Sequence, residues 1–328
     1  MSVTSQTSSS GSAAVSDCHR GIIDISGPVP GYEWEPSMTT EPVRGRVWTI
    51  TDGVFRTLAI EGDTGVIAVD TFWSPGSARQ YRRALQSHFP RKPVHTIIYT
   101  HDHLDHTGFG ADFAPDADQI LAHELTAEVI ARRSSDGQLP ATRTWSGERL
   151  EVSIDGAEFE LIYPGPTHGT GNTALYFPNE RFLYMADTVF TGPTYNIVPD
   201  FLWTSWIPNT RRLLGLDWDL YVPGHFWRLS RREFEADFEL WDATAACALD
   251  ALRAGVDIDN FADVKKFTYE RMDEPFGSRT FRFDEFAAIN VLTHMVHYQT
   301  GGWGLRDYEP YSNEPFKTTL PQRLGSPL

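Results

Sequence analysis

The most constraining feature of this sequence is the hexapeptide HDHLDH, which begins at His101 and holds three histidines and two aspartates. Only Thr100 separates it from the largely apolar run of residues 94–99, and such a run predicts a buried strand. Alternate side chains of an extended chain point the same way, so His101, His103 and Asp105 are expected to converge. The Thr-Gly pair after the hexapeptide favours a turn that brings His106 to the same point. Imidazole nitrogens and carboxylate oxygens bind zinc, iron or manganese, so the hexapeptide predicts a metal site rather than a polar surface turn.

Acidic residues outnumber basic ones, with 44 Asp and Glu against 28 Lys and Arg, and the formal charge at pH 7 is -16. A charge of this sign repels phosphate backbones, so nucleic acid is not expected as a substrate or partner. No apolar run approaches the roughly 20 residues of a membrane-spanning helix, so no membrane association is expected. The two cysteines, Cys18 and Cys247, are expected to be reduced thiols of a cytoplasmic protein.

Short runs rich in Val, Ile and Thr, separated by turn residues, predict strands in two blocks, residues 46–70 and 149–185. Each block is followed by segments with helical spacing. A predicted helix over residues 74–89 has one apolar stripe, formed by Ala78, Tyr81, Leu85 and Phe89. This alternation suits two sheets packed face to face with helices outside, an αββα arrangement of the α/β (α+β) class.

Three regions are expected along the chain. Residues 1–20 are expected to form a disordered tail because they are rich in Ser, Thr and Gly. A secretion signal is not expected there, because the segment has neither a basic start nor an apolar stretch. Residues 21–228 are expected to form the catalytic core. Residues 229–328 are expected to add a helical extension, with helices over 230–254 and 283–300, and an aromatic tail. The extension could belong to the same domain or form the interface of a homo-oligomer.

Three later motifs follow the hexapeptide in order. His168 lies in Gly-Pro-Thr-His-Gly-Thr-Gly-Asn, Asp187 follows the apolar run Phe-Leu-Tyr-Met-Ala, and His225 ends the run Leu-Tyr-Val-Pro-Gly-His. With the hexapeptide, and over roughly residues 46–228, these motifs resemble the HxHxDH signature and the later ligand positions of the metallo-β-lactamase superfamily. The resemblance implies that superfamily's αββα sandwich, followed here by a helical C-terminal extension.

The resemblance also implies a dinuclear site for two divalent metal ions, with Zn²⁺ as the first choice and iron or manganese as alternatives. One ion would be held by His101, His103 and His168, and the other by Asp105, His106 and His225, with Asp187 bridging the two. Asp70 matches a superfamily aspartate that supports the site from behind, where a carboxylate would fix the tautomer of a ligand histidine. A turn-forming aspartate is the alternative interpretation of Asp70.

The implied reaction is hydrolysis by a hydroxide that bridges the two ions, with Asp105 as the catalytic residue that orients it and takes its proton. The expected substrate is a small, hydrophobic ester, lactone, sulfate ester or activated aryl ether. Aromatic residues between Asp187 and Asp219 could form an apolar wall for this substrate or simply pack in the core. The candidates for the wall are Phe190, Tyr195, Trp203 and Trp206.

Some positions depart from better-known branches of the superfamily. Lactonases that act on acyl-homoserine lactones have Tyr where this chain has Phe190, and the commonest zinc β-lactamases have Cys where it has Asp187. Gly usually follows the last ligand histidine, whereas here Phe226 follows it. The alternative function is an iron-dependent oxidoreductase of the same fold, similar to persulfide dioxygenases, which would leave the second ligand set idle.

Overall fold

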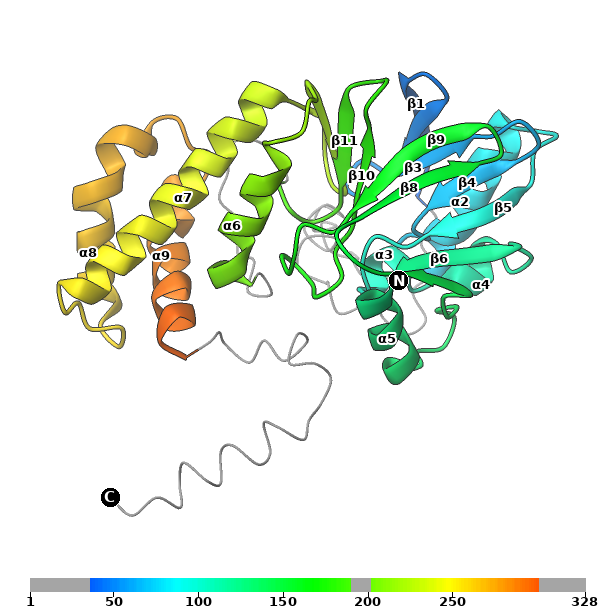
Figure 1. Ribbon diagram of the computed structural model, residues 1–328. Helices are drawn as coiled ribbons and strands as arrows, with labels where there is room; N and C mark the ends of the chain where they lie inside the picture. The colour runs from blue at the N-terminus through cyan, green and yellow to red at the C-terminus, as the bar shows by residue number, and fades with distance from the viewer. Residues whose placement is uncertain (1–35, 190–201, 301–328) are drawn as a thin grey trace, which may run out of the picture.

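The computed structural model describes residues 36–189 and 202–300, and two facing β-sheets form its centre (Figure 1). The first sheet has seven strands in chain order: β1 (Thr39–Arg44), β2 (Val47–Thr51), β3 (Arg56–Glu61), β4 (Val66–Val69), β5 (Val94–Ile98), β6 (Gln119–His123) and β7 (Arg143–Trp145). Strands β1 to β4 pair antiparallel, whereas β4 to β7 pair in parallel. Parallel neighbours need crossover connections, and these contain the helices of this half. They are α2 (Pro75–His88), α3 (Leu104–Thr107), α4 (Gly110–Phe113) and α5 (Glu124–Arg133).

The second sheet has six strands in the order β13-β12-β11-β10-β9-β8. Their bounds are β8 (Arg149–Ile154), β9 (Ala157–Ile162), β10 (Ala174–Phe177), β11 (Phe182–Met185), β12 (Leu220–Pro223) and β13 (Leu229–Ser230). Four of the five pairings are antiparallel, and the exception is the parallel pair β11 and β12. Helix α6 (Trp203–Leu213) lies between these two strands in the chain.

Strand β4 shows how the first sheet is buried on both faces. All four of its residues are buried, and they alternate between two apolar clusters. Ile67 and Val69 belong to the cluster between the two sheets, whereas Val66 and Ala68 belong to the cluster under α2. The predicted stripe of α2 is confirmed, because Ala78, Tyr81 and Leu85 are all at most 2% exposed and pack in that same cluster.

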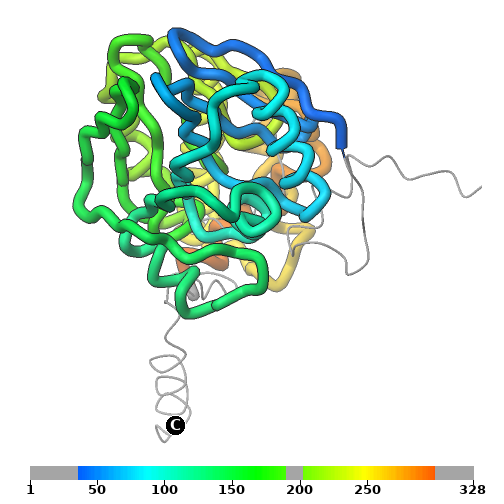
Figure 2. Tube along the Cα trace, turned by 90° about the vertical axis from the view of Figure 1, so that its right-hand side faces the viewer, coloured from blue at the N-terminus to red at the C-terminus, as the bar shows by residue number. Residues whose placement is uncertain are grey.

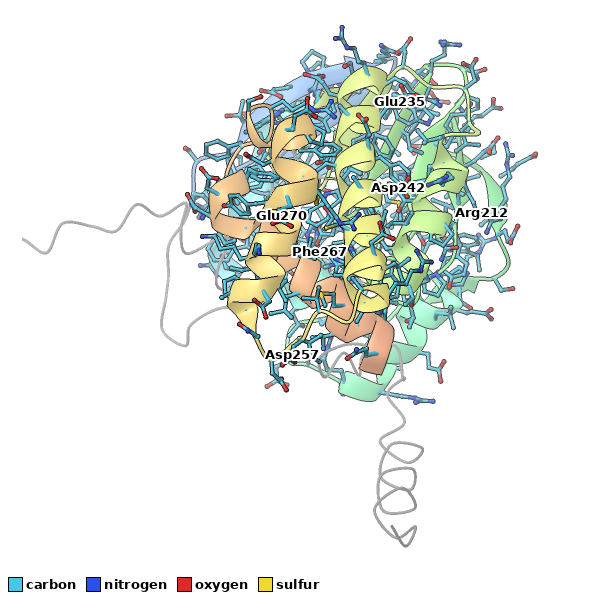
Figure 3. All side chains as sticks on the ribbon, turned by 90° about the vertical axis from the view of Figure 1, so that its left-hand side faces the viewer. Arg212, Glu235, Asp242, Asp257, Phe267 and Glu270 are labelled. Atoms are coloured by element: carbon cyan, nitrogen blue, oxygen red, sulfur yellow. The ribbon has the colours of Figure 1, made fainter. Side chains whose placement is uncertain are left out.

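Helices cover the outer face of each sheet, which confirms the αββα architecture. Figure 2 shows α2 and the neighbouring helices on the side of the first sheet. On the other side, α6 packs with α7 (Arg231–Arg253), α8 (Phe261–Met272) and α9 (Phe283–Thr300) to form a helical layer. Apolar side chains of this layer pack against Leu183, Met185 and Tyr221 of the second sheet. Figure 3 shows its outer face, where α7 and α8 present acidic residues such as Glu235 and Glu270.

The predicted helices over residues 230–254 and 283–300 correspond to α7 and α9. The sequence analysis missed α8 and the π-helical turn η1 (Asp273–Gly277) that follows it. Helix α8 has only three buried residues, Val264, Thr268 and Met272, so its apolar periodicity is too weak to stand out. Within the two described ranges, no helix has both the length and the hydrophobicity that crossing a bilayer requires.

Candidate metal centre

The candidate metal centre lies where several strands end at the same edge of the sandwich. Strand β5 leads to His101, while β11 and β12 end two residues before Asp187 and His225. Because β11 and β12 are parallel neighbours, the residues that follow their carboxyl ends meet. His168 lies in the loop that precedes β10, the other neighbour of β11. Tertiary structure therefore gathers residues that are as much as 124 positions apart, such as His101 and His225.

The hexapeptide itself is only partly extended. His103 has β-region angles, φ -65° and ψ 141°, and it caps the short helix α3, which begins at Leu104. The expectation that an extended chain would align Asp105 with His101 and His103 is therefore wrong. Helix α3 turns the chain instead, and this turn directs Asp105 and His106 together into a separate group of candidate ligands.

The first group contains His101, His103, His168 and Asp187, and one donor atom of each lies within 4.8 Å of the others. Nε2 of His168 is 3.1 Å from Oδ2 of Asp187, and Nε2 of His101 is 3.6 Å from the same oxygen. His103 is partly exposed, whereas the other three side chains are buried. The group can hold one ion close to the surface of the molecule.

The second group contains Asp105, His106, Asp187 and His225, again with donor atoms within 4.8 Å of one another. Nε2 of His225 is 2.9 Å from Oδ1 of Asp187, and Nε2 of His106 is 3.2 Å from Oδ2. Asp187 thus belongs to both groups, with Oδ1 beside His225 and Oδ2 near both the first group and His106. The structure brings together all seven residues that the sequence singled out as ligands.

The donor atoms fit a cation better than they fit one another. Nε2 of His101 is buried but makes no hydrogen bond, which is a costly arrangement for a polar atom. The Nε2 atoms of His106 and His225 face each other at 3.2 Å, where they can share only one proton between them. A divalent cation would satisfy all these nitrogens at once, and the histidine and aspartate donors suit such an ion. These residues therefore form a candidate site for divalent metals.

The electrostatics favour metal binding as well. Burial lowers the pKa of His101 well below its ordinary value, so its ring is neutral and can act as a ligand. Burial opposes ionisation of Asp187, but the surrounding imidazoles, above all His106, outweigh it and hold the pKa of this carboxyl well below its usual range. Burial also opposes the charge on His106, but Asp187 and Asp105 raise its pKa well above the ordinary value. A metal entering the second group therefore displaces a proton.

Asp70 lies behind the second group, as the resemblance implies. Its buried carboxylate accepts hydrogen bonds from the backbone N–H and the hydroxyl of Thr100, at 2.9 and 2.7 Å. Its Oδ2 lies 3.5 Å from Nδ1 of His106. A carboxylate at Nδ1 orients the ring so that Nε2 faces Asp187.

Two residues that hold the hexapeptide in place were missed by the sequence analysis. Arg133, at the end of α5, donates to the backbone carbonyl of Asp102 and lies 3.5 Å from its carboxylate. Gln138 donates to the same carbonyl at 3.2 Å and to the hydroxyl of Thr107 at 2.7 Å. That hydroxyl donates in turn to the carbonyl of His103 at 2.9 Å. No local pattern announces these contacts, because the partners are 31 to 36 positions apart.

The four aromatic residues named as a substrate wall divide into two pairs. Phe190 and Tyr195 lie outside the described residues. Trp203 and Trp206 are 1% and 0% exposed, and their ring centroids lie 4.9 and 6.3 Å from that of Trp241 in α7. The structure therefore gives these two indoles a packing role in the helical layer, which was the alternative considered for them.

Phe55 is an aromatic residue at the site that the sequence analysis did not identify. Its ring centroid lies 4.6 Å from that of His225 and 5.7 Å from that of His106. The indole of Trp73 stacks on Phe55 at 5.8 Å and donates a hydrogen bond to Asp52 at 2.8 Å. The second group thus has an apolar flank, formed by the turn between β2 and β3.

Several known proteins are similar in sequence to this chain. A 2,4-dinitroanisole O-demethylase subunit beta from Nocardioides sp. is 29% identical over 277 residues, which are 82% of this chain and 84% of that protein. An alkyl/aryl-sulfatase from Saccharomyces cerevisiae and a linear primary-alkylsulfatase from a Pseudomonas species are each 24% identical, over 62% and 64% of this chain. The chain spans only 44% of the length of each of these two sulfatases.

Solved structures share the fold. The inverting sec-alkylsulfatase from Pseudomonas sp. superposes on 80% of this chain and 50% of its own, with a TM-score of 0.66 and 16% identity. A metallo-beta-lactamase from Pontibacter korlensis superposes on 63% of this chain and 99% of its own, with a TM-score of 0.56 and 20% identity. The family model described as "Metallo-beta-lactamase superfamily" matches residues 56–225, just over half of the chain and all seven candidate ligands. The protein therefore belongs to the metallo-β-lactamase superfamily, as a metal-dependent hydrolase.

Proposed function

We propose that this protein is a dinuclear metal-dependent hydrolase that cleaves an activated aryl ether or a sulfate ester with a hydrophobic alkyl or aryl part. The observation that carries the proposal is the sharing of Asp187 between two complete groups of donor atoms. A single ion would need only one of these groups. Zn²⁺ is the first choice for both positions, with iron or manganese as alternatives, because imidazole and carboxylate donors suit all three.

When bound, a pair of divalent cations supplies acidified water as the nucleophile and polarises the bond to be broken. The residues of the chain position that chemistry. Asp187 holds the two donor groups at a fixed separation, and Asp105 is the general base. The carboxylate of Asp105 is 6% exposed and lies 3.8 Å from Nε2 of His106, so it is within reach of a water at the second group.

The choice of substrate draws on the named relatives. The most similar of the named relatives is a subunit of an O-demethylase for a dinitro-substituted anisole, and the others act on alkyl or aryl sulfates. Hydrolysis of an aryl methyl ether adds water across the carbon–oxygen bond and gives a phenol and methanol. Hydrolysis of a sulfate ester gives an alcohol or phenol and hydrogen sulfate.

The test is a substrate panel assayed on protein reconstituted with zinc, manganese or iron. The panel contains 2,4-dinitroanisole, 4-nitrophenyl sulfate, a linear alkyl sulfate, 4-nitrophenyl acetate and a lactone. The expected result is turnover of the ether or of a sulfate, lost on chelation and restored by metal. Turnover confined to the acetate or the lactone would contradict the proposed substrate class, and full turnover after chelation would contradict the metal mechanism.

The molecular mass of the purified protein in solution should also be measured by light scattering, because the Nocardioides relative is named as a subunit. We propose that this chain too works in an assembly, either as a homo-oligomer or with a second subunit.

An iron-dependent oxidoreductase similar to persulfide dioxygenases is the other function considered. Such a mononuclear enzyme has no use for Asp105, His106 and His225, which form a complete second group here. Oxygen uptake by the iron-loaded protein with a persulfide distinguishes the two functions, and the hydrolase proposal expects none.

A further inference from the structure

The loop that carries His225 is held on both sides by one residue, Arg56, the first residue of β3. The backbone N–H of Arg56 donates a hydrogen bond to the carbonyl of Gly224 at 2.7 Å. Its guanidinium Nε donates to the carbonyl of Phe226 at 2.9 Å. These carbonyls belong to the residues immediately before and after His225, so Arg56 brackets this candidate ligand from 169 positions away in the sequence.

The backbone at Phe226 needs such support. Its φ is 57°, in the left-handed region that residues with a Cβ rarely adopt. A strained conformation of this kind persists only where the surroundings hold it in place. The N–H of Phe226 donates to the carbonyl of Val54 at 2.8 Å, and Phe55 and His225 form an isolated antiparallel β-bridge. Arg56 completes this arrangement by binding the Phe226 carbonyl.

The guanidinium of Arg56 is itself anchored at its other end. Nη1 donates to the carboxylate of Glu41 in β1 at 2.9 Å and to the hydroxyl of Thr49 in β2 at 2.8 Å. The side chain is only 7% exposed, and its planar fork leaves little freedom once these contacts form. The position of the Phe226 carbonyl is therefore set by the first sheet, although His225 follows a strand of the second.

We propose that Arg56 is a positioning residue that fixes His225 for metal binding in the second group. The proposal rests on the ligand sets of the proposed function. Arg56 acts through the loop backbone, not on a donor atom. The three histidines of the first group lie in the loops after β5 and before β10, and the contacts of Arg56 described above do not involve these loops. Loss of the guanidinium is therefore expected to lower the metal affinity of the second group and to leave that of the first group unchanged.

Arg228 provides a matched control. It is also a partly buried arginine, it lies only three positions after His225, and its Nη2 donates to the same Thr49 hydroxyl at 2.7 Å. Its Nη1 donates to the carbonyl of Pro42 at 2.7 Å. In the described part of the chain, its hydrogen bonds thus go to β1 and β2 and not to the carbonyls beside His225. If loss of an arginine simply destabilised the packing of β1 and β2 against the His225 loop, substitution of Arg56 and substitution of Arg228 would have the same effect.

The experiment titrates metal-free protein with Zn²⁺ against a chromophoric chelator, and repeats the titration with Co²⁺ to record the absorption band of each ion. The wild-type protein is expected to bind two ions. In Arg56→Met one affinity should stay within about threefold of wild type, and the other should fall about 10–100-fold, as for other residues that orient metal ligands. In Arg228→Met both affinities should stay within about threefold.

Arg56→Lys is the second variant, in case Arg56→Met does not fold. One ammonium cannot reach Phe226, Glu41 and Thr49 together, so a smaller but selective loss of the same affinity is expected. Unchanged affinities in a folded Arg56 variant, or an equal loss in Arg56→Met and Arg228→Met, would overturn the role of Arg56. A wild-type protein that binds only one ion would instead overturn the proposed dinuclear site.

Discussion

Oδ1 of Asp187 lies 2.9 Å from Nε2 of His225, while Oδ2 lies 3.1 Å from Nε2 of His168 in the first group and 3.2 Å from Nε2 of His106 in the second. This side chain is the sole residue common to the two groups of candidate ligands in the described residues. Its backbone is strained, with φ 52°, so the chain accepts an energetic cost to present the carboxylate in this way. The two metal positions are therefore expected to be linked through Asp187.

Replacing Asp187 by Ala is expected to lower the affinity of the protein for both metal ions. His225→Ala should lower its affinity only for the ion of the second group. Removal of the shared carboxylate takes a donor from each group, and removal of His225 takes a donor from the second group alone. These losses of metal affinity should exceed the roughly 10–100-fold loss that follows removal of a residue that only orients a ligand. Metal content by mass spectrometry after dialysis is the measurement, and Asp242→Ala, at an exposed ion pair with Arg211, is the control. Two tightly bound ions in the Asp187 variant would show that it is not a bridge.

Asp70→Asn is expected to lower metal affinity at the second group about 10–100-fold without unfolding the protein. The amide can keep a hydrogen bond to the Thr100 backbone but cannot offer a carboxylate to Nδ1 of His106. Thr100→Val removes the hydroxyl contacts with Asp70 and with Nδ1 of His101 but leaves the Asp70 carboxylate beside His106, so it should have a smaller effect on the second group. The measurement is a Zn²⁺ titration of wild type, Asp70→Asn and Thr100→Val. Equal affinities in all three proteins would favour the alternative that Asp70 is only a turn-forming residue.

Acid should destabilise the fold partly through His294. This side chain of α9 is fully buried, its Nδ1 donates to the carbonyl of Asn290 at 2.7 Å, and burial lowers its pKa to about 3. An unfolded histidine has a pKa of about 6.5. Between pH 6.5 and 3 the unfolded chain therefore binds a proton that the folded chain does not, and stability falls as the pH falls.

His294 is expected to contribute roughly 1.4 kcal/mol of lost stability for each pH unit in that window. Urea unfolding of wild type and His294→Gln at pH 7.5, 6.5, 5.5 and 4.5 measures this contribution as the difference between the two slopes. His88→Gln is the matched substitution at an exposed histidine. Parallel curves for wild type and His294→Gln would contradict the expectation.

Phe226→Gly is expected to be more stable than Phe226→Ala by about 1 kcal/mol. Both substitutions remove the ring, but only glycine adopts a φ of 57° without a steric penalty. Chemical denaturation of the pair gives the difference directly, and an alanine variant as stable as the glycine variant would argue against the left-handed conformation.

Much of the centre could be predicted from sequence because its signals are local. Each signal lies within a short segment of the chain, a single strand or a few turns of one helix. The signals are the hexapeptide, the apolar runs before Asp187 and His225, and the stripe of α2. The resemblance of these ordered motifs to the metallo-β-lactamase superfamily implied the assignment of all seven candidate ligands to two groups. Helix α8 escaped because three buried residues in one helix leave little periodicity to detect.

Other features depend on contacts that no local pattern encodes. The helix that redirects Asp105, the burial of Trp203 and Trp206, and the contact between Arg56 and Phe226 across 170 positions all arise when layers pack against one another. The sequence by itself determined which residues reach the ends of the strands, because side-chain periodicity and turn residues act over short distances. Only the tertiary structure decided which side chains hold those ends in place, because such partners are chosen by the packing of one sheet and its helices on the other.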